Sequence, residues 1–534
     1  MVVADGNDIL RQRVEVYTND GSGGFPINPS WSSGDVDYHG HLSVGDIDQD
    51  GFLDVAVAVF LGPSGFGSKG RAKAYSNQGG TLESTPSWST ADRFFAFSCD
   101  LGDADSDGDL DLAVATGEPY FDPPDQNRLY TNDAGSLDTS PSWLSSGNDH
   151  TLDVAFGDID GDGDLDLAFA PTGGATKVYL QGPGGLATTP GWTATDSNSM
   201  FGNTLTWSDV DGDGDLELAI SDNNQLTGGA GVFKIYDNLG ATLATTPFWS
   251  DFGGQVSGVA LADLNGDGLP ELAGGVWFGG NRIYPNQGGT FPTNQAWDST
   301  ENNVVEVLVF GDVDEDGLQT VVGETHAPNG GRTYYVDQRP LQSLQRVVVD
   351  GVELTASEYG WDREDGWIVL DRTPAVDVVV DYTWSDSLDL LSTSWDQSIG
   401  NLLYLRYPVG RAVFRNDAGG TNLPALSGNA PLIGGTFTAA VDVGGAGNNL
   451  GGVVGYATPL ELGTGFGVLL VNPLDPAGEL FGFAVTGGSG IVQFPTAVPN
   501  DLGLLGFTLS AQGFGLGGAA GVQLFNALDL TVGA

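Results

Sequence analysis

The chain has 534 residues, of which 70 are Asp or Glu and 18 are Lys or Arg, so its formal net charge is −52. This charge, with no basic patch in the sequence, excludes nucleic acid and anionic membranes as expected partners. The 40% of hydrophobic residues is enough for a packed core, and no apolar run is long enough to predict a membrane span.

Six acidic loops of nine residues recur in the first part of the chain. Each places oxygen-bearing side chains at positions 1, 3 and 5 and Gly at position 6, and five of the six also carry an acid at position 9. The predicted ligands, with position 7 included for its backbone carbonyl, are in chain order Asp46, Asp48, Asp50, Phe52 and Asp54; Asp103, Asp105, Asp107, Asp109 and Asp111; Asp158, Asp160, Asp162, Asp164 and Asp166; Asp209, Asp211, Asp213, Asp215 and Glu217; Asp263, Asn265, Asp267, Leu269 and Glu271; and Asp312, Asp314, Asp316 and Leu318.

These loops carry the donor set of a calcium site. Ca²⁺ takes about six to eight oxygen ligands, and alternate side chains of a tight loop can all point at one centre. Mg²⁺ is disfavoured because it tends to keep its bound waters. Solvated acidic turns would explain one such copy. Six copies in phase instead predict about five or six structural Ca²⁺ ions.

Two copies depart from the pattern. Asn265 replaces Asp at position 3 of the fifth loop, which keeps Glu271 at position 9 and is expected to bind. In the sixth loop, Thr320 stands where the acid of position 9 belongs. We therefore expect the sixth site, which begins at Asp312, to be the weakest.

The same series of short segments follows each loop. An apolar strand comes first, then a strand that ends in Tyr, then a Gly-rich turn and a strand that contains Trp. The Tyr residues recur at intervals of 48–58 residues from Tyr17 to Tyr284. Four short strands in a unit of this length are typical of a propeller blade. The expected fold is all-β, a seven-bladed β-propeller with eight blades as the alternative, in which Tyr and Trp pack between blades.

The loops, together with the Leu-Ala-Val-Ala type of strand that follows them, resemble the FG-GAP/VCBS repeats of integrin-α-like propellers. The resemblance covers residues 1–340. It implies a Ca²⁺-stabilised propeller whose metal loops join the first and second strands of each blade. Such propellers serve adhesion and recognition and occasionally act as enzymes, so the resemblance leaves the ligand open.

The pattern changes twice in the second part of the chain. Residues 341–385 alternate like strands around turns such as Asp350-Gly351 and predict a small β insertion. Residues 386–420 echo the repeat without its metal loop and are interpreted as a degenerate closing blade.

Residues 421–534 contain no Lys or Arg and are rich in Gly and small apolar residues. This segment resembles C-terminal β domains of secreted, multi-domain bacterial proteins of the planctomycete type, and the resemblance implies a β-sandwich. A disordered Gly-rich tail is the alternative. Regularly spaced aliphatic residues argue against that alternative.

The first residues match the strand that follows a metal loop elsewhere. Met1-Val-Val-Ala aligns with Val55-Ala-Val-Ala, so the chain as given begins inside a blade. The first blade would then have an open edge, which three kinds of strand can complete. These are the segment near residues 376–391 of the same chain, residues upstream of Met1, or a strand from a neighbouring molecule. Closure within the chain is the favoured one. Met1 is not followed by a signal peptide, which indicates a removed signal or a start that is not the natural one.

No catalytic motif stands out. The four histidines are His39, His41, His150 and His326; the first two predict an outward-facing strand, with a transition-metal pair as the alternative. Cys99, the single cysteine, is interpreted as a small core residue. The long loops at residues 60–70 and 116–127, the second with Tyr120 and Phe121, are either packed loops or a platform for carbohydrate or protein.

The sequence therefore predicts a non-enzymatic, extracellular or cell-surface protein, because millimolar Ca²⁺ outside cells would fill weak loops. Its expected roles are adhesion, recognition of a protein or carbohydrate ligand, or self-association into an array or filament. The alternative is a secreted enzyme acting on polysaccharide. A dense cluster of His, Tyr, Arg and carboxylate side chains in the central channel would favour that alternative.

Overall fold

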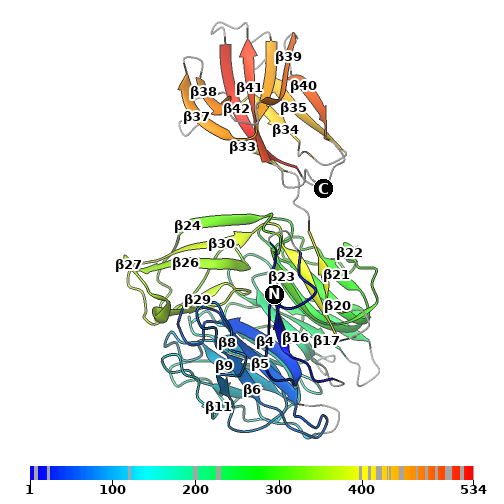
Figure 1. Ribbon diagram of the computed structural model, residues 1–534, viewed down its shortest axis with the longest axis vertical. Coiled ribbons are helices and arrows are strands. Elements are labelled where there is room, and N and C mark those ends of the chain that lie inside the picture. Colours follow the sequence, from blue (N-terminus) through cyan, green and yellow to red (C-terminus); the bar gives the residue numbers. More distant parts are fainter. Residues whose placement is uncertain are drawn as a thin grey trace. The chain divides into compact units, whose positions relative to one another are not determined.

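The computed structural model describes residues 1–534 except 5–9, 21–23, 118–121, 197–201, 224–229, 396–399, 407–410, 416–421, 423, 430, 432–434, 444–449, 465–466, 475–478, 487–490, 499–507, 517–521 and 533–534. The chain divides into two compact units, Met1–Leu405 and Arg406–Ala534 (Figure 1). Within the described residues the one helical element is the 3₁₀ turn Ala356–Glu358, and no helix there has the length and apolar character needed to cross a membrane.

The first unit repeats one small antiparallel sheet, in which strands pair in chain order. The sheets are β1 (Val2–Ala4), β2 (Val14–Val16) and β3 (Trp31–Ser32); β4 (Tyr38–Gly45), β5 (Asp54–Leu61), β6 (Ala72–Tyr75) and β7 (Trp88–Ser89); β8 (Ala96–Gly102), β9 (Asp111–Thr116), β10 (Arg128–Tyr130) and β11 (Trp143–Leu144); β12 (Thr151–Gly157), β13 (Asp166–Pro171), β14 (Lys177–Tyr179) and β15 (Trp192–Thr193); β16 (Gly202–Ser208), β17 (Glu217–Asp222), β18 (Gly231–Tyr236) and the start of β19 (Trp249–Ala262); the rest of β19 with β20 (Glu271–Gly279), β21 (Asn281–Tyr284) and β22 (Trp297–Asp298); and β23 (Asn303–Gly311), β31 (Asp389–Ser394) and β32 (Leu402–Tyr404).

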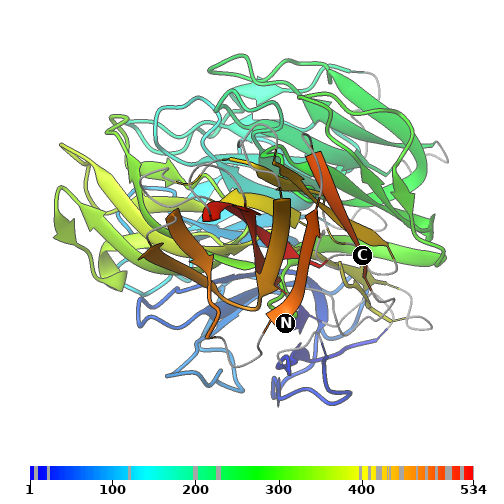
Figure 2. The same ribbon diagram turned by 90° about the horizontal axis from the view of Figure 1, so that it is seen from above.

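The first strands of these sheets share one centre. Residues of β4, β8, β12, β16, β19 and β23 all line a single cavity, and β1 lines it too. Figure 2 shows the blue strands of the first sheets and the green strands of the later ones on different sides of the unit. Sheets arranged around a central space are the architecture of a β-propeller, as the sequence predicted.

Aromatic side chains join neighbouring sheets. The Trp of one sheet meets the Tyr of the next edge-to-face, as in Trp88–Tyr130 at 5.6 Å and Trp192–Tyr236 at 5.2 Å between ring centroids. Tyr130 and Tyr236 have no exposed surface. Such pairs add about 0.5–1.5 kcal/mol beyond the area that they bury. The prediction that these residues pack between blades is confirmed.

A repeated asparagine closes the ring. Asn132 Nδ2 donates to the carbonyl of Ile47 in the acidic loop of the preceding sheet, at 2.8 Å, and Asn238 Nδ2 donates to that of Ile159, at 2.9 Å. Asn19, of the first sheet, makes the corresponding hydrogen bond to Val313, of the seventh. The ring therefore closes within the chain. The segment near residues 376–391 was predicted to complete the open edge of the first blade. Its strand β31 instead pairs with β23 and forms the second strand of the seventh sheet.

The insertion is larger than predicted. It comprises a sheet in the order β24 (Leu318–His326), β30 (Val378–Ser385), β26 (Leu341–Val349) and β27 (Val352–Glu353), and a second sheet of β25 (Thr333–Tyr335), β29 (Trp367–Leu370) and β28 (Tyr359–Trp361). Both sheets bury one apolar core that includes Val347, Ile368 and Tyr382. The insertion begins before the predicted boundary at residue 341. Its first strand is β24, which pairs with the edge of β30 that β26 leaves open.

The second unit is a sandwich of two sheets. One has the order β33 (Arg411–Arg415), β42 (Val522–Thr531), β41 (Thr508–Leu516), β36 (Leu450–Tyr456) and β39 (Glu479–Thr486); the other has β34 (Leu426–Gly428), β35 (Thr436–Asp442) and β40 (Ile491–Ala497), with β37 (Pro459–Thr464) and β38 (Gly467–Val471) as a separate pair. Phe437 and Phe525 both belong to the buried core of this unit. The predicted closing blade, residues 386–420, is divided, because β33 pairs with β42.

Candidate metal loops and central cavity

The acidic loops share one backbone form. The position 1 carboxylate of Asp46 accepts hydrogen bonds from the N–H groups of Asp50, at 3.0 Å, and Gly51, at 2.9 Å, and Asp103 does the same with its own positions 5 and 6. Position 4 is left-handed, as at Gln49 with φ 57°. The hydrogen bonds that the position 1 carboxylate accepts thus fold the loop around this side chain.

The acid at position 9 fastens each loop to the blade. In the first loop, Asp54 Oδ2 accepts from the Ile47 N–H at 2.9 Å, and Asp54 Oδ1 accepts from the Asn77 N–H at 2.6 Å. Asp111 has the same two bonds, to Ala104 and Asn132. Both acids are fully buried. The position 9 carboxylate therefore links the second residue of its own loop to a residue just after the third strand of the sheet.

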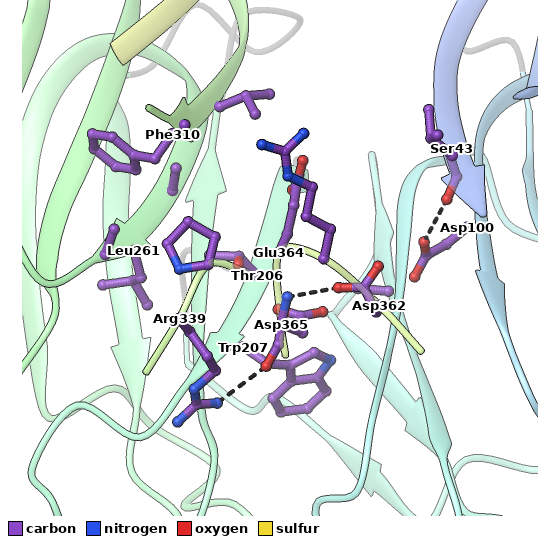
Figure 3. Close-up of a pocket in the computed structure, with 18 of the residues that line it drawn as sticks. Ser43, Asp100, Thr206, Trp207, Leu261, Phe310, Arg339, Asp362, Glu364 and Asp365 are labelled. Atoms are coloured by element: carbon purple, nitrogen blue, oxygen red, sulfur yellow. Dashed lines mark hydrogen bonds between the residues drawn. The ribbon is translucent and has the colours of Figure 1, made fainter. Parts of the chain in front are cut away.

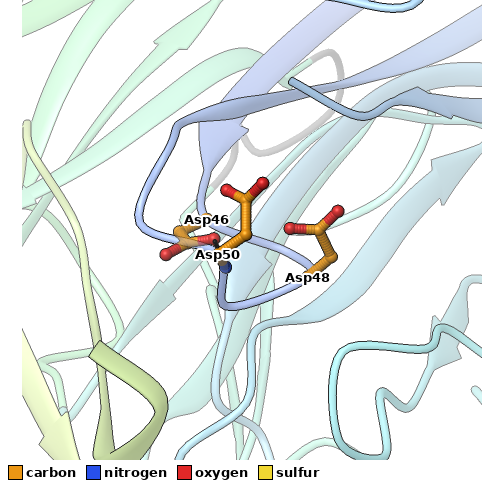
Figure 4. Close-up of side chains that lie close together, drawn as sticks. All are labelled: Asp46, Asp48 and Asp50. Carbon is orange, nitrogen blue, oxygen red and sulfur yellow. Dashed lines mark hydrogen bonds between the residues drawn. The ribbon is translucent and has the colours of Figure 1, made fainter. Parts of the chain in front are cut away.

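The predicted carboxylates come together in five of the six loops. One oxygen from each of three side chains lies within 4.8 Å of the others in these sets: Asp46, Asp48 and Asp50; Asp103, Asp105 and Asp111; Asp158, Asp160 and Asp166; Asp209, Asp211 and Glu217; and Asp312, Asp314 and Asp316. Figure 4 shows the first set, with Asp46, Asp48 and Asp50 on one tight loop. In the fifth loop Asn265 Nδ2 donates to Glu271 at 2.7 Å. The remaining residues predicted at position 5, Asp107, Asp162, Asp213 and Asp267, accept hydrogen bonds from the N–H of position 7.

The side chains at position 7 do not join these groups. Asp109 accepts hydrogen bonds from Gln49 and from the Ala134 N–H of the neighbouring turn, and Phe52 is 42% exposed. Asp164, Asp215 and Leu269 occupy the same position in their loops. That position 7 offers its backbone carbonyl to a cation stays a prediction.

The geometry of the loops fits a cation. Burial, with repulsion from Asp107 and Asp105, raises the pKa of Asp103 to about 8, and burial raises that of Glu217 to about 8. The Oδ1 atoms of Asp48 and Asp160 are buried and have no protein hydrogen-bond partner. A divalent ion at the centre would supply that partner and offset the repulsion.

In the sixth loop, the residue predicted at position 9 does not lie where the other loops place it. Thr320 lies in β24, opposite Thr383, and Leu318 begins the same strand. Neither residue follows the loop into the seventh sheet, because the chain leaves the blade after Gly317. The assignment of Thr320 to position 9 is therefore wrong.

A cavity of about 1460 Å³ occupies the centre of the first unit. The turn between β28 and β29, with Asp362, Glu364 and Asp365, lines it together with Asp100 of β8 (Figure 3). Burial, with repulsion from Asp362, raises the pKa of Asp100 to about 8. Glu364 lines the same cavity, where desolvation by the surrounding protein, with repulsion from Asp362, raises its pKa to about 7. Arg339 donates to the Asp365 carbonyl at 3.3 Å.

Two histidines lie at the same centre. His39 is 1% exposed, and the side chain of His41 is 13% exposed, with Nδ1 3.3 Å from Asp153 Oδ1. The predicted outward-facing strand is therefore wrong for both. His150 Nε2 lies 3.0 Å from the Asp122 carbonyl, and His326 Nε2 lies 3.0 Å from Glu324. Tyr120 and Phe121 lie outside the described residues.

The imidazole of His41 is expected to titrate above its ordinary pKa of 6.5. Burial lowers its pKa, but the hydrogen bond and charge of Asp153, with Glu306 adding to them, raise it overall. Protonated His41 therefore stabilises the fold fully below pH 6.5, and this contribution is lost as the pH rises through the folded pKa. Proton NMR, with His41→Gln for assignment, measures the shift, and Asp153→Asn should lower it. A His41 pKa below 6.5 would contradict the geometry.

One family model matches part of the first unit. The FG-GAP-like repeat model matches residues 120–169, 160–220 and 209–274, which include the loops that begin at Asp158, Asp209 and Asp263. No curated protein matches the chain. A solved chain described as "Structure of Dos1 propeller" aligns with a TM-score of 0.36 and 11% sequence identity, over 59% of this chain and 73% of that one. The first unit is thus an all-β propeller that carries FG-GAP-like repeats.

Proposed function

We propose that the protein is a non-enzymatic, extracellular recognition module whose propeller is stabilised by Ca²⁺. The observation that carries this proposal is the repeated loop in which oxygens of three carboxylate side chains lie within 4.8 Å of one another. Such an arrangement favours a bound divalent cation. Loops with this donor set fill at the millimolar Ca²⁺ found outside cells.

Exposed aromatic side chains support a role in recognition. Phe252 and Phe278 are 64% and 66% exposed, and Phe278 adopts a positive φ of 58°. A bulky residue rarely takes this conformation without a reason. Aromatic side chains on a rigid scaffold suit a protein or carbohydrate partner, and self-association of the chain uses the same kind of surface.

The second candidate function is a secreted enzyme that acts on polysaccharide. The cavity favours it, because His41, Tyr335, Arg339 and several carboxylates line the same space. Carboxyls with raised pKa values, such as Asp100 and Glu364, are the groups that general acid catalysis uses. Such a cluster in the central channel is the feature expected of an enzyme.

A screen on acidic and neutral polysaccharides separates the two functions. We expect binding at most, with no release of new reducing ends or unsaturated products. Glu364→Gln removes the exposed cavity carboxylate, and Glu353→Gln makes the same change on the exposed rim of the insertion as a matched control. Turnover that Glu364→Gln abolishes and Glu353→Gln preserves would establish the enzyme instead.

A further inference from the structure

We infer that the sixth cation site is split by the insertion and that Asp389 supplies its position 9 ligand. This inference rests on the proposed calcium loading of the loops. The site consists of Asp312, Asp314 and Asp316 before the insertion and Asp389 after it. Residues 318–386 are then inserted within one metal loop. A cation at this site would bind residues on both sides of the insertion and hold its two ends together.

Strand register places Asp389 at position 9. In the intact loops the residue before position 1 pairs with position 9, as in Gly45 with Asp54 and Gly102 with Asp111. In the seventh sheet Gly311 pairs with Asp389. Because register fixes which face a side chain takes, Asp389 occupies the place of the intact position 9 acids.

The hydrogen bond typical of position 9 is also present. Asp389 Oδ2 accepts from the Val313 N–H at 2.9 Å, as Glu217 accepts from Val210 at 2.8 Å. Asp389 is 1% exposed, and Leu388 before it is 2% exposed, as Leu110 and Leu165 at position 8 of the second and third loops are buried. The second half of the loop is therefore rebuilt from residues beyond the insertion.

The two halves meet at Gly317 and Ser387. A Cβ on Gly317 would lie 2.4 Å from the Ser387 N atom, so only glycine fits there. The Asp386 N–H donates to the Gly317 carbonyl at 3.1 Å. Glu315 keeps the left-handed position 4, with φ 57°. The first six positions thus keep the conformation of the other loops, and the insertion interrupts the loop between positions 6 and 7.

An unpartnered oxygen points to the ligand. Asp312 is 8% exposed, and its Oδ1 is buried without a protein hydrogen-bond partner, as is Asp314 Oδ1. Oxygens of Asp312, Asp314 and Asp316 lie within 4.8 Å of one another. Asp389 is absent from that group, as Asp54 is from the first loop's group. Adding a fourth carboxylate makes a hard divalent cation of the Ca²⁺ type the matching ligand.

The insertion also rests on two other metal loops. Arg332 donates to the Ser106 carbonyl of the second loop. The Thr333 N–H donates to the Gly163 carbonyl of the third loop at 3.1 Å, and the Asp158 N–H donates to the Tyr335 hydroxyl at 3.0 Å. A cation in the split site therefore fixes the root of a segment whose turn, residues 361–365, lines the central cavity.

Native mass spectrometry in Ca²⁺ tests this assignment by counting bound ions. Asp389→Asn and Asp316→Asn should each bind one ion fewer than the wild type, and the double variant should also bind one fewer, since both residues serve one site. Thr320→Ala, at the position that counting along the loop sequence assigned to position 9, should bind the wild-type number of ions. Hydrogen exchange of the β25 peptides should rise in Asp389→Asn and stay unchanged in Thr320→Ala.

The outcomes separate the inference from the proposed function. A wild-type protein that binds no Ca²⁺ would overturn the proposed calcium loading. A wild-type number of ions in Asp389→Asn, or two ions fewer in the double variant, would overturn the split site alone. Asp316→Asn keeps the test decisive if Asp389→Asn does not fold, because the partly exposed Asp316 lies on the loop itself.

Discussion

Excess chelator is expected to lower the unfolding temperature of the propeller sharply. A ligand that binds only the folded state adds about 2.7 kcal/mol per site when its free concentration is about 100 times Kd. Removing the cation also leaves three or more carboxylates facing one another in each loop, as in the set of Asp103, Asp105 and Asp111. Differential scanning calorimetry with and without chelator measures the change.

The second unit provides the internal control. Its core around Phe437 and Phe525 lies outside the acidic loops, so its own transition should not move. Adding back Ca²⁺ should restore the propeller transition, whereas an equal concentration of Mg²⁺ should restore it less, because Mg²⁺ dehydrates reluctantly. A calorimetric trace that chelator leaves unchanged would rule out structural calcium.

The features predicted best from the sequence are those that repeat at short range. Position 9 of an intact loop lies eight residues after position 1, so Asp111 could be assigned by counting from Asp103. Tyr130 could be assigned to the space between sheets because its spacing recurs. Each of these contacts lies within one blade or between consecutive blades. The constant spacing of the repeats is therefore enough to predict it.

The features that the sequence left hidden depend on distant pairing. Asp389 pairs with Gly311 across the whole insertion, and no local spacing predicts that register. One signal was present, since Leu388-Asp389-Leu390 repeats the Leu110-Asp111-Leu112 pattern. The strand β33 likewise pairs with β42 near the end of the described chain. His41 faces the centre because its strand is the innermost of a ring, which only closure reveals.

Lys234 forms the most deeply buried ion pair in the described part of the ring. Lys234 is 2% exposed and lies 2.7 Å from Asp196 and in contact with Asp222, which is 1% exposed. Tyr236 donates to the other oxygen of Asp196 at 2.8 Å. Removing one partner of such a buried group leaves an uncompensated charge in the interior.

Replacing this lysine is therefore expected to be strongly destabilising. Lys234→Met keeps the length of the side chain but leaves Asp222 buried without its cation, and should lower the free energy of unfolding by about 3–5 kcal/mol. Urea denaturation in Ca²⁺ buffer, followed by tryptophan fluorescence, measures the loss. Adding Asp222→Asn to Lys234→Met should recover part of it, since the second change removes the unpaired charge.

Lys177 offers the matched control, because it pairs with Asp149 at 2.5 Å at the equivalent place in the previous sheet while its side chain is 20% exposed. With water able to reach the pair, Lys177→Met should lower the free energy of unfolding by only about 1 kcal/mol. Equal losses in the two variants would show that burial is not what makes Lys234 important. A double variant less stable than Lys234→Met alone would show that Asp222 stabilises the sheet through other contacts.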